Sequence, residues 1–431
     1  MISLEIPSLR QLRAFAAAAR LQSVSAAARE VNLSQPGVTQ SIQALEARLQ
    51  TQLFDRRRSG CYVTELGAVL LPRVQRFFDH IAAALSEPVV GSPFVGRHAV
   101  DATINKITPV HIRSLIAIAE SLSFDAAARR LNISQPSLYR PAKELERELR
   151  RTLYQRTARG VTANAQGAEL ARRFQVALRE IEYGLDELQA ARGLVVSRIS
   201  IGNIPHSGTQ ILSAAIDRLL ASYPNARVDV VDDHYDVLLN DLRAGKLDLL
   251  FGVLRRPAWA VDVTEERLFE NPYVPVARNG HPLTRLARIA LRDLAAYDWI
   301  MPAQGTPRRQ AFERMFAGLP RAPTVSIETT SLPIYRSVLA SSDRLTLMSR
   351  LAMPQNDKAG LTVLPFRSPH LTRSDGIVSR VAWHPTAVHL TFVDLLRREG
   401  RRLSAGRSAA SSEASDARTS RHPRLAQADP A

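Results

Sequence analysis

The sequence predicts a multidomain α/β protein in which two copies of a small helical unit precede a larger domain of alternating strands and helices. Three observations predict this fold class. The chain has 431 residues, of which 45% are hydrophobic and 23% charged, which is enough for several globular cores. Its first part repeats itself at an offset of 100 residues, with apolar residues at helical spacing. From residue 198 onward, short β-rich runs alternate with helical ones.

The internal repeat holds one register without a gap. Residues 23–29 (SVSAAAR) align with 123–129 (SFDAAAR), and residues 32–36 (NLSQP) align with 132–136 (NISQP). The same register persists as far as Gly67 and its counterpart Gly167. Chance similarity does not hold register over such a length, so the first part of the chain contains two copies of one unit.

Each copy is predicted to form three helices. In the first copy, Ser23 or Ser25 can cap the second helix and Ser34 the third. The early turns of the third helix tolerate Pro36, because amides there have no intrahelical acceptor. The buried stripe of the third helix leaves a polar face on its open side, formed by Gln35, Thr39, Gln40 and Gln43.

Two short helices that meet at a tight turn, the second with a polar face, are the arrangement that places a helix in the DNA major groove. Glutamine can form two hydrogen bonds with adenine, and threonine can contact a thymine methyl group. The alternative is a solvated polar face on a structural helix. Residues 53–64 (LFDRRRSGCYVT) then predict a hairpin with a cationic tip, suited to DNA phosphates. A polar helix followed by such a hairpin indicates DNA binding more specifically than either part.

The first copy of the repeat resembles a domain of a known protein family. Residues 9–67 closely resemble the N-terminal winged helix-turn-helix of LysR-type transcriptional regulators. The match includes Ser34-Gln35-Pro36 at the start of the recognition helix, Leu45-Glu46 near its end, Leu53-Phe54 and Arg56 at the entry to the hairpin, and Thr64-x-x-Gly67 at the start of a linker helix. The resemblance and the polar face together predict DNA contacts from Ser34, Gln35, Pro36, Thr39, Gln40, Gln43, Arg56, Arg57 and Arg58.

The second copy, residues 107–167, departs from this pattern at two positions. Pro141 falls about two turns into the third helix, where it removes an amide donor and should bend the helix. Asn164 replaces the linker threonine but can cap a helix equally well. We expect both copies to contact DNA; the alternative is that one copy only positions the other. The DNA contacts expected from the second copy are Ser134, Gln135, Tyr139, Arg140, Lys143, Arg156 and Arg159.

A long amphipathic helix is predicted after each hairpin. In residues 165–192 the apolar positions are separated by threes and fours, and a seam of this length needs a partner. The family precedent and this spacing both imply pairing with the same helix of a second chain. The first linker helix contains Pro72, which should kink it, and gives way to a connection at residues 87–96. Its seam could pack within the chain instead, and the sequence leaves this open.

Residues 197–400 resemble the effector-binding domain of the same family, which is built like a periplasmic binding protein from two α/β lobes with a mostly parallel sheet. Residues 299–316 and 327–350 resemble most the subgroup that regulates sugar or aromatic-acid catabolism. Family precedent places the effector between the lobes, and hydroxyls and free amides at helix starts form anion sites, so we expect a small carboxylate-bearing or sugar-derived effector. Any single hydroxyl among these residues could instead be an ordinary helix cap. The expected effector-binding residues are Pro205, His206, Ser207, Gln304, Gly305, Thr306, Thr330 and Ser331.

Several function classes are disfavoured. His206 and His234 have neither a second ligand at metal-like spacing nor a nucleophile motif, so we expect no metal, no cofactor and no enzymatic activity. The single cysteine, Cys61, allows no intrachain disulfide. A signal peptide and a run of about 18 apolar residues are both missing from the sequence, which predicts a cytoplasmic protein that does not enter a membrane. The net charge of +16 supports a polyanionic partner without proving one.

The sequence therefore predicts an effector-responsive, sequence-specific transcriptional regulator whose partners are double-stranded DNA, a small-molecule effector, further copies of the chain in a homodimer or homotetramer, and RNA polymerase. The alternative is a ligand-binding or enzymatic α/β protein whose helical repeats serve only oligomerisation. The clustered arginines after the third helix favour the first reading, because such a cluster is costly without a polyanion. The predicted segments are residues 7–66 and 105–164 for the two winged helix-turn-helix units, 67–104 and 165–195 for the linkers, 197–400 for the effector domain and 401–431 for a disordered tail.

Overall fold

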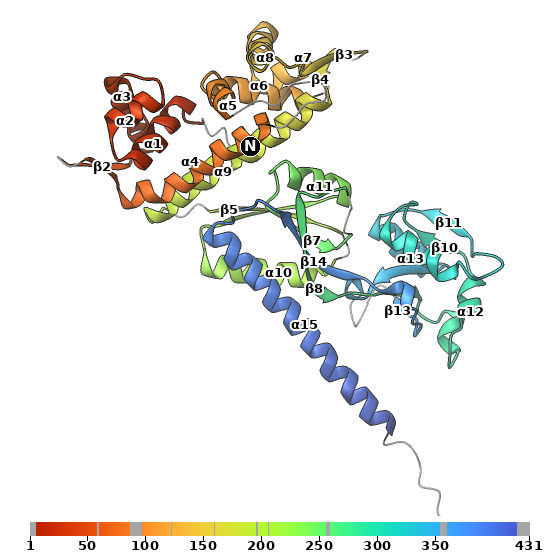
Figure 1. The fold of residues 1–431 in the computed structure, drawn as a ribbon. Helices are drawn as coiled ribbons and strands as arrows, with labels where there is room; N and C mark the ends of the chain where they lie inside the picture. The colour runs from red at the N-terminus through yellow and green to blue at the C-terminus, as the bar shows by residue number, and fades with distance from the viewer. Residues whose placement is uncertain are drawn as a thin grey trace, which may run out of the picture. The chain divides into compact units, whose positions relative to one another are not determined.

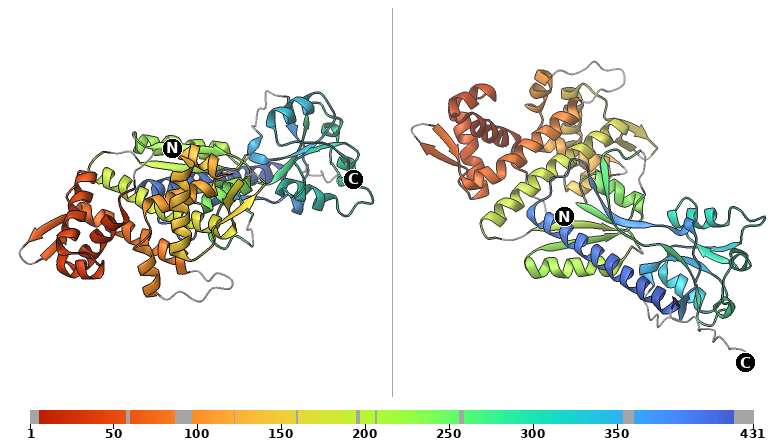
Figure 2. Two further views of the ribbon diagram at one scale, coloured as in Figure 1. Left: turned by 90° about the horizontal axis from the view of Figure 1, so that it is seen from above. Right: turned by 60° about the horizontal axis from the view of Figure 1, so that its bottom comes forward.

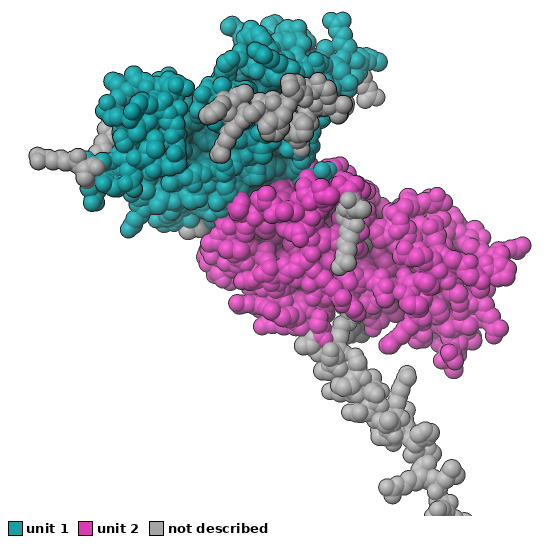
Figure 3. Space-filling model, viewed as in Figure 1, with its two compact units in different colours: residues 1–198, 225–227, 243–246 teal, residues 199–224, 228–242, 247–431 magenta. Residues whose placement is uncertain are grey.

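The computed structural model describes residues 6–57, 60–86, 97–121, 123–158, 160–194, 197–205, 207–255, 259–353 and 360–419. Figures 1 and 2 show these elements in three views. The chain divides into two compact units, which Figure 3 distinguishes by colour. Unit 1 comprises residues 1–198, 225–227 and 243–246, and unit 2 comprises residues 199–224, 228–242 and 247–431.

Unit 1 contains the two copies of the repeat, each with three helices, a hairpin and a long helix. The first copy consists of α1 (Leu9–Leu21), α2 (Val24–Glu30), α3 (Gln35–Leu49), β1 (Phe54–Arg57), β2 (Gly60–Val63) and α4 (Glu65–Ser86). A short helix, α5 (Arg97–Ile104), precedes the second copy. The second copy consists of α6 (Pro109–Ala119), α7 (Phe124–Leu131), α8 (Gln135–Leu149), β3 (Tyr154–Thr157), β4 (Gly160–Ala163) and α9 (Ala165–Ala191).

The capping residues act as expected in both copies. The Ser23 hydroxyl accepts a hydrogen bond from the Ala26 amide at 3.2 Å, so Ser23 and not Ser25 caps α2. The Ser34 hydroxyl accepts from the Gly37 amide at 3.2 Å and caps α3. Asn164 also caps α9, because its Oδ1 accepts from the Gly167 amide at 2.8 Å. These bonds satisfy amides that helix starts leave without partners.

The repeated glycines at the start of α4 and α9 have a steric cause. A Cβ atom on Gly67 would lie 2.3 Å from the Leu53 carbonyl oxygen, and one on Gly167 would lie 2.2 Å from the Leu153 oxygen. Any side chain would push each long helix away from its own hairpin. Because both positions are glycine, each long helix can pack closely against the hairpin of its own copy, and it does so in the same way in the two copies.

The long helices α4 and α9 lie side by side within unit 1 (Figure 2). The apolar seam of α9, which we expected to pair with the same helix of a second chain, is packed here against α4 of its own chain. That expectation was wrong for this structure because periodicity identifies a seam but not the chain that covers it. Both α4, which contains Pro72, and α8, which contains Pro141, run without a break in their helix assignment. The expected connection at residues 87–96 lies outside the described residues.

Unit 2 is an α/β unit with two lobes. In the first lobe, a five-stranded sheet has the order β6-β5-β7-β14-β8. Its elements are β5 (Arg198–Asn203), α10 (Thr209–Ser222), β6 (Arg227–Asp232), α11 (Tyr235–Arg243), β7 (Leu249–Val253), β8 (Val263–Glu270), β14 (Ser374–Arg380) and α15 (Ala387–Thr419). The first strands and helices fall where alternation predicted them, although residues at the ends of β6 and α11 cluster with unit 1.

The second lobe of unit 2 has a three-stranded sheet of order β12-β9-β13 and a two-stranded sheet, β10-β11. Its strands are β9 (Tyr273–Arg278), β10 (Trp299–Met301), β11 (Val325–Glu328), β12 (Thr346–Ser349) and β13 (Leu361–Val363). Its α-helices are α12 (Leu291–Ala295), α13 (Pro307–Phe316) and α14 (Leu332–Ala340). Short 3₁₀ turns lie at Pro282–Arg285, Arg350–Ala352 and Pro369–Leu371.

One expectation about unit 2 needs correction. The main sheet is mixed and not mostly parallel: β5 is parallel to β7, but β14 is antiparallel to both β7 and β8. The cause is the chain path, since β8 leads into the second lobe and β14 returns from it in the opposite direction. Helix α15 extends to Thr419 and so includes the first residues of the segment 401–431, whose disorder stays a prediction. Residues 420–431 lie outside the described residues.

Candidate functional site

The candidate DNA-reading face of the first copy is the open side of α3. Val38, Ile42 and Leu45 are buried at 0–1% exposure and fix the helix on its copy. Ser34, Gln35, Pro36, Gln40 and Gln43 are exposed, and Thr39 is half-buried. The structure therefore places all of the expected α3 contacts on one accessible face of the helix.

A half-buried carboxylate group joins the reading helix to the hairpin. The Glu46 Oε1 atom accepts hydrogen bonds from the amides of Leu53 and Phe54, at 2.8 and 3.1 Å. Glu146 forms the same bonds in the second copy, to Leu153 and Tyr154 at 2.7 and 3.2 Å. The repeated Leu-Glu pair thus fixes the hairpin relative to the reading helix.

Cationic residues lie on the hairpin beside α3. Arg57 is exposed, its Nε is 2.8 Å from Asp55 Oδ2, and its guanidinium lies 5.9 Å from the centre of the Tyr62 ring. The backbone of Arg56 belongs to β1, but its side chain and all of Arg58 lie outside the described residues, as does Arg159 in the second copy. Among the described arginines of the two hairpins, Arg57 and Arg156 are exposed and able to meet phosphates.

The reading face of the second copy is also exposed but carries different chemistry. Ser134, Gln135, Tyr139, Arg140 and Lys143 are all exposed on α8. Arg140 and Lys143 form ion pairs on their own helix, to Glu144 at 3.0 Å and to Glu146 at 2.7 Å. The hydrogen bond to Glu146 raises the pKa of Lys143. Pro141 is buried and points away from this face.

The expected effector residues follow three strands of unit 2. Pro205 and Ser207 follow β5, Gln304, Gly305 and Thr306 follow β10, and Thr330 and Ser331 follow β11. His206 lies outside the described residues. Thr306 caps α13 by accepting from the Arg309 amide at 3.4 Å, while Gln304, Gly305 and Thr330 are exposed. Ser207 is 1% exposed, and its hydroxyl accepts a hydrogen bond from Arg373 at 2.6 Å.

Two buried arginines that sequence reasoning missed connect these loops. Arg373 lies where the chain returns to the first lobe, 5.3 Å from the Tyr273 ring and paired with the fully buried Asp375 at 2.7 Å. Burial opposes its charge, but Asp375 more than compensates, and the pKa of Arg373 is raised.

The second arginine, Arg308, has a different set of partners. Its guanidinium donates to the Tyr335 hydroxyl at 3.0 Å and to the Leu347 carbonyl at 3.2 Å, and it contacts the Met348 sulfur. The Tyr335 hydroxyl in turn donates to the Thr329 carbonyl at 2.6 Å. Burial lowers the pKa of Arg308, and the positive charge of Arg373 acts in the same direction. These hydrogen-bond partners are all uncharged, so this buried cation is suited to an anionic ligand.

A sequence signal for Arg308 exists. Arg308 and Arg309 occupy the first turn of α13, where the helix dipole favours acidic residues and disfavours cations. Arg309 is neutralised by Glu313 and Glu328, both at 2.9 Å, whereas Arg308 turns into the interior. The doubled arginine after the capping Thr306 was therefore the available clue.

The described residues give no support for other classes of site. They contain no group of three or more histidine, cysteine, aspartate or glutamate residues that could hold a metal ion. His234 is exposed. Among the helices of the described part, none is long and apolar enough to cross a bilayer.

Helical units with exposed reading faces, joined in one chain to a two-lobed α/β unit, define the class of a DNA-binding regulator with a sensing domain. The family comparison agrees. The model "Bacterial regulatory helix-turn-helix protein, lysR family" matches residues 9–68 and 110–168, and "LysR substrate binding domain" matches residues 192–401. The chain belongs to the LysR family of transcriptional regulators, which bind DNA, respond to small-molecule effectors, form oligomers and are not enzymes.

Individual relatives extend over most of the chain. The transcriptional regulator GalR of Pseudomonas putida is 31% identical over 383 residues, which cover 88% of this chain and 94% of GalR. GbpR of Azospirillum brasilense is 28% identical, covering 62% of this chain and 79% of its own length. The structure of a full-length OxyR variant from Pseudomonas aeruginosa is 23% identical, covers 68% of this chain and 95% of OxyR, and has a TM-score of 0.53, which supports the fold.

Proposed function

We propose that both copies of the repeat contact DNA, with α3 and α8 as the recognition helices of a tandem winged helix-turn-helix. The observation that supports this proposal is the pair of reading faces, each exposed and each fixed by a half-buried glutamate to a hairpin with an exposed arginine. The alignment with GalR supports it, because 383 residues exceed the length of an effector domain with one helix-turn-helix unit. The expected contacts are those named above for the two copies, including Arg56, Arg58 and Arg159.

Footprinting on the intergenic DNA upstream of the gene tests this proposal. Gln35→Ala and Arg140→Ala should each weaken binding, because a good base contact contributes about 1–3 kcal/mol of discrimination. Arg218→Ala, which removes an exposed cation far along the sequence in α10, is the matched control and should leave the footprint intact. If Arg140→Ala changes neither affinity nor footprint, the second copy does not read DNA and only positions the first.

We propose further that the effector is a small carboxylate, such as a sugar-derived or aromatic acid, bound between the two lobes of unit 2. Arg308 would pair with the carboxylate, and the loops with Ser207, Thr306 and Ser331 would supply neutral hydrogen bonds. The uncharged partners of this buried arginine support the proposal. A bound carboxylate would offset the unfavourable free energy of burying the charged Arg308 guanidinium. Because this stabilisation is available only when the carboxylate is bound between the lobes, binding would be coupled to lobe closure.

Calorimetry with a panel of carboxylate metabolites tests the effector site. Arg308→Met should abolish measurable binding of any carboxylate that the native protein binds, whereas Arg309→Met should retain it, because Arg309 is already neutralised by two glutamates. If no carboxylate binds, or if binding survives in both Arg308→Met and Thr306→Val, the proposed site is misplaced. RNA polymerase is a further proposed partner, to be tested by transcription of the bound promoter in vitro.

A further inference from the structure

The pairing of α4 with α9 occurs within one chain and is antiparallel. Arg73, in the third turn of α4, contacts Glu187 near the end of α9 and also Glu180, whereas Arg76, one turn later in α4, contacts Glu180, almost two turns earlier in α9 than Glu187. Residue numbers thus rise on one helix as they fall on the other. Figure 1 shows the two helices running along each other, with the first copy attached to α4 and the second to α9.

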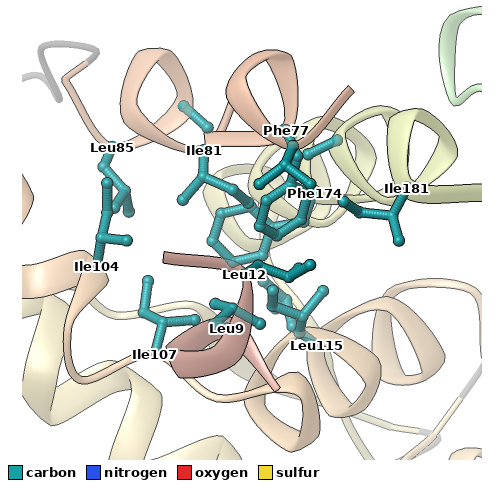
Figure 4. Close-up of a cluster of buried hydrophobic side chains, with 14 of the residues drawn as sticks. Leu9, Leu12, Phe77, Ile81, Leu85, Ile104, Ile107, Leu115, Phe174 and Ile181 are labelled. Atoms are coloured by element: carbon teal, nitrogen blue, oxygen red, sulfur yellow. The ribbon is translucent and has the colours of Figure 1, made fainter. Parts of the chain in front are cut away.

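This pairing buries the apolar seams of both helices. The residues that form them are at most 5% exposed: Leu70, Val74, Phe77 and Ile81 from α4, and Leu170, Phe174, Ala177 and Ile181 from α9. They belong to one hydrophobic cluster that also contains Leu9, Leu12 and Leu115 from the two copies (Figure 4). Because the cluster is covered inside a single chain, these seams offer no apolar face to a second chain.

A buried ionic cluster makes the pairing specific for unlike helices. The Arg73 side chain, 3% exposed, is 2.9 Å from Glu180 and 2.5 Å from Glu187. It also lies over the Tyr183 ring at 5.2 Å. The backbones of α4 and α9 also lie close together at this point, because a Cβ atom on Gly184 would be 2.9 Å from the Arg73 Cβ.

The repeat shows why α4 would not pair with a second α4. At the offset of 100 residues, Glu87 matches Glu187 but His80 occupies the position of Glu180, so two α4 helices would lack the more deeply buried of the two carboxylates that Arg73 contacts. A pair of α9 helices would keep the carboxylates but leave the apolar seam of α4 uncovered. The heterotypic pair is the arrangement that satisfies both helices.

This pairing relates the two reading helices by an approximate two-fold rotation. The copies are alike, each is attached to its long helix through the same glycine contact, and the long helices are antiparallel, so the copies are related by an approximate two-fold axis. Two helix-turn-helix units related in this way present their recognition helices to two half-sites separated by one DNA turn or a multiple of it. The faces differ, since Gln40 and Gln43 suit adenine whereas Arg140 and Lys143 suit guanine.

We infer that one chain is an internal pseudo-dimer that reads a bipartite DNA site with two non-identical half-sites, the α3 half preferring adenine and the α8 half preferring guanine. This inference rests on the proposed DNA binding by both copies. A single chain then supplies both recognition helices, which would otherwise come from two separate chains. In an oligomer of this protein, each chain then binds one complete bipartite site.

Selection of bound duplexes from a random library, with the full chain, tests the inference. The native protein should select a motif with two different halves. Gln40→Ala with Gln43→Ala should reduce the preference in one half at least tenfold and leave the other half unchanged, and Arg140→Ala with Lys143→Ala should do the reverse. These positions are exposed, so the variants should fold like the native protein.

The outcomes separate the inference from the proposed function. A palindromic motif, in which changes to one copy weaken both halves equally and changes to the other copy have no effect, would overturn the internal pseudo-dimer while leaving DNA binding in place. Failure of the native chain to select any motif would remove the proposed function, and the inference with it. Half-specific losses from both pairs of substitutions would support both.

Discussion

Removal of Arg73 should destabilise unit 1 selectively. Its guanidinium is buried among carboxylates of α9, with Glu180 itself only 4% exposed. Arg73→Met keeps much of the side-chain volume but leaves a buried carboxylate with Arg76, at 3.0 Å, as its main remaining cation. Breaking a buried ion pair from one side costs about 3–5 kcal/mol, and because Arg76 remains we expect a value near the lower end.

The sequence supplies a built-in control for this measurement. All three tryptophans, Trp259, Trp299 and Trp383, lie in unit 2, so their fluorescence reports unfolding of that unit alone, whereas far-UV circular dichroism also reports the helices of unit 1. With a urea dependence of about 2 kcal/mol per molar, Arg73→Met should lower the midpoint of the unit 1 transition by about 1.5 M. The tryptophan transition should stay in place.

Arg173→Met is the matched variant, because Arg173 occupies the position of Arg73 in the second copy. Arg173 is 28% exposed and pairs with Glu169 on its own helix, an interaction worth about 0.3–0.5 kcal/mol. We expect a midpoint shift of less than about 0.3 M. Equal shifts for the two variants, or a tryptophan transition that moves as far as the dichroism signal, would refute the assignment of Arg73 to a buried link between α4 and α9.

Three further predictions concern the sites. Arg308→Lys should weaken carboxylate binding by roughly tenfold or more in calorimetry, because lysine keeps the charge but loses the fork that contacts Tyr335 and an anion together; unchanged affinity would exclude a paired contact. Arg57→Ala should weaken binding to all duplexes alike and reduce the slope of log affinity against log salt by about 1, and a loss confined to one sequence would mean that Arg57 reads bases. Gly67→Ala should lower the thermal midpoint of unit 1 by several degrees, since its Cβ would lie 2.3 Å from the Leu53 oxygen; a shift no larger than that of an exposed alanine substitution such as Gln52→Ala would contradict the steric argument.

Local features of the fold were predictable from sequence because they depend on neighbouring residues. Helix starts followed from the capping serines at 23 and 34, and the exposed face of α3 followed from the spacing of its apolar residues. The equivalence of Asn164 and Thr64 as caps followed from the shared ability of their side chains to accept an amide hydrogen bond. The alternation of strands and helices at the start of unit 2 was predictable for the same reason.

Features set by long-range packing were not predictable. The seam of α9 has the same periodicity whether its partner is α4 or a second chain, and only the buried contacts of Arg73 identify the partner. The mixed main sheet depends on the path of β14 back from the second lobe. Arg373 is an ordinary surface residue type whose side chain is buried by segments far apart in the chain, whereas for Arg308 the sequence offered one signal, the doubled arginine in the first turn of α13.

Disulfide trapping can show whether the two copies are paired within one chain. In a Cys61→Ala background, which removes the single native cysteine, Arg73→Cys and Gly184→Cys would place two thiols where a Cβ atom on residue 184 would lie 2.9 Å from the Cβ of residue 73. Each single-cysteine variant serves as the control. On oxidation and non-reducing electrophoresis, we expect a cross-linked species with the mass of one chain. A cross-linked species with the mass of two chains would contradict pairing within one chain.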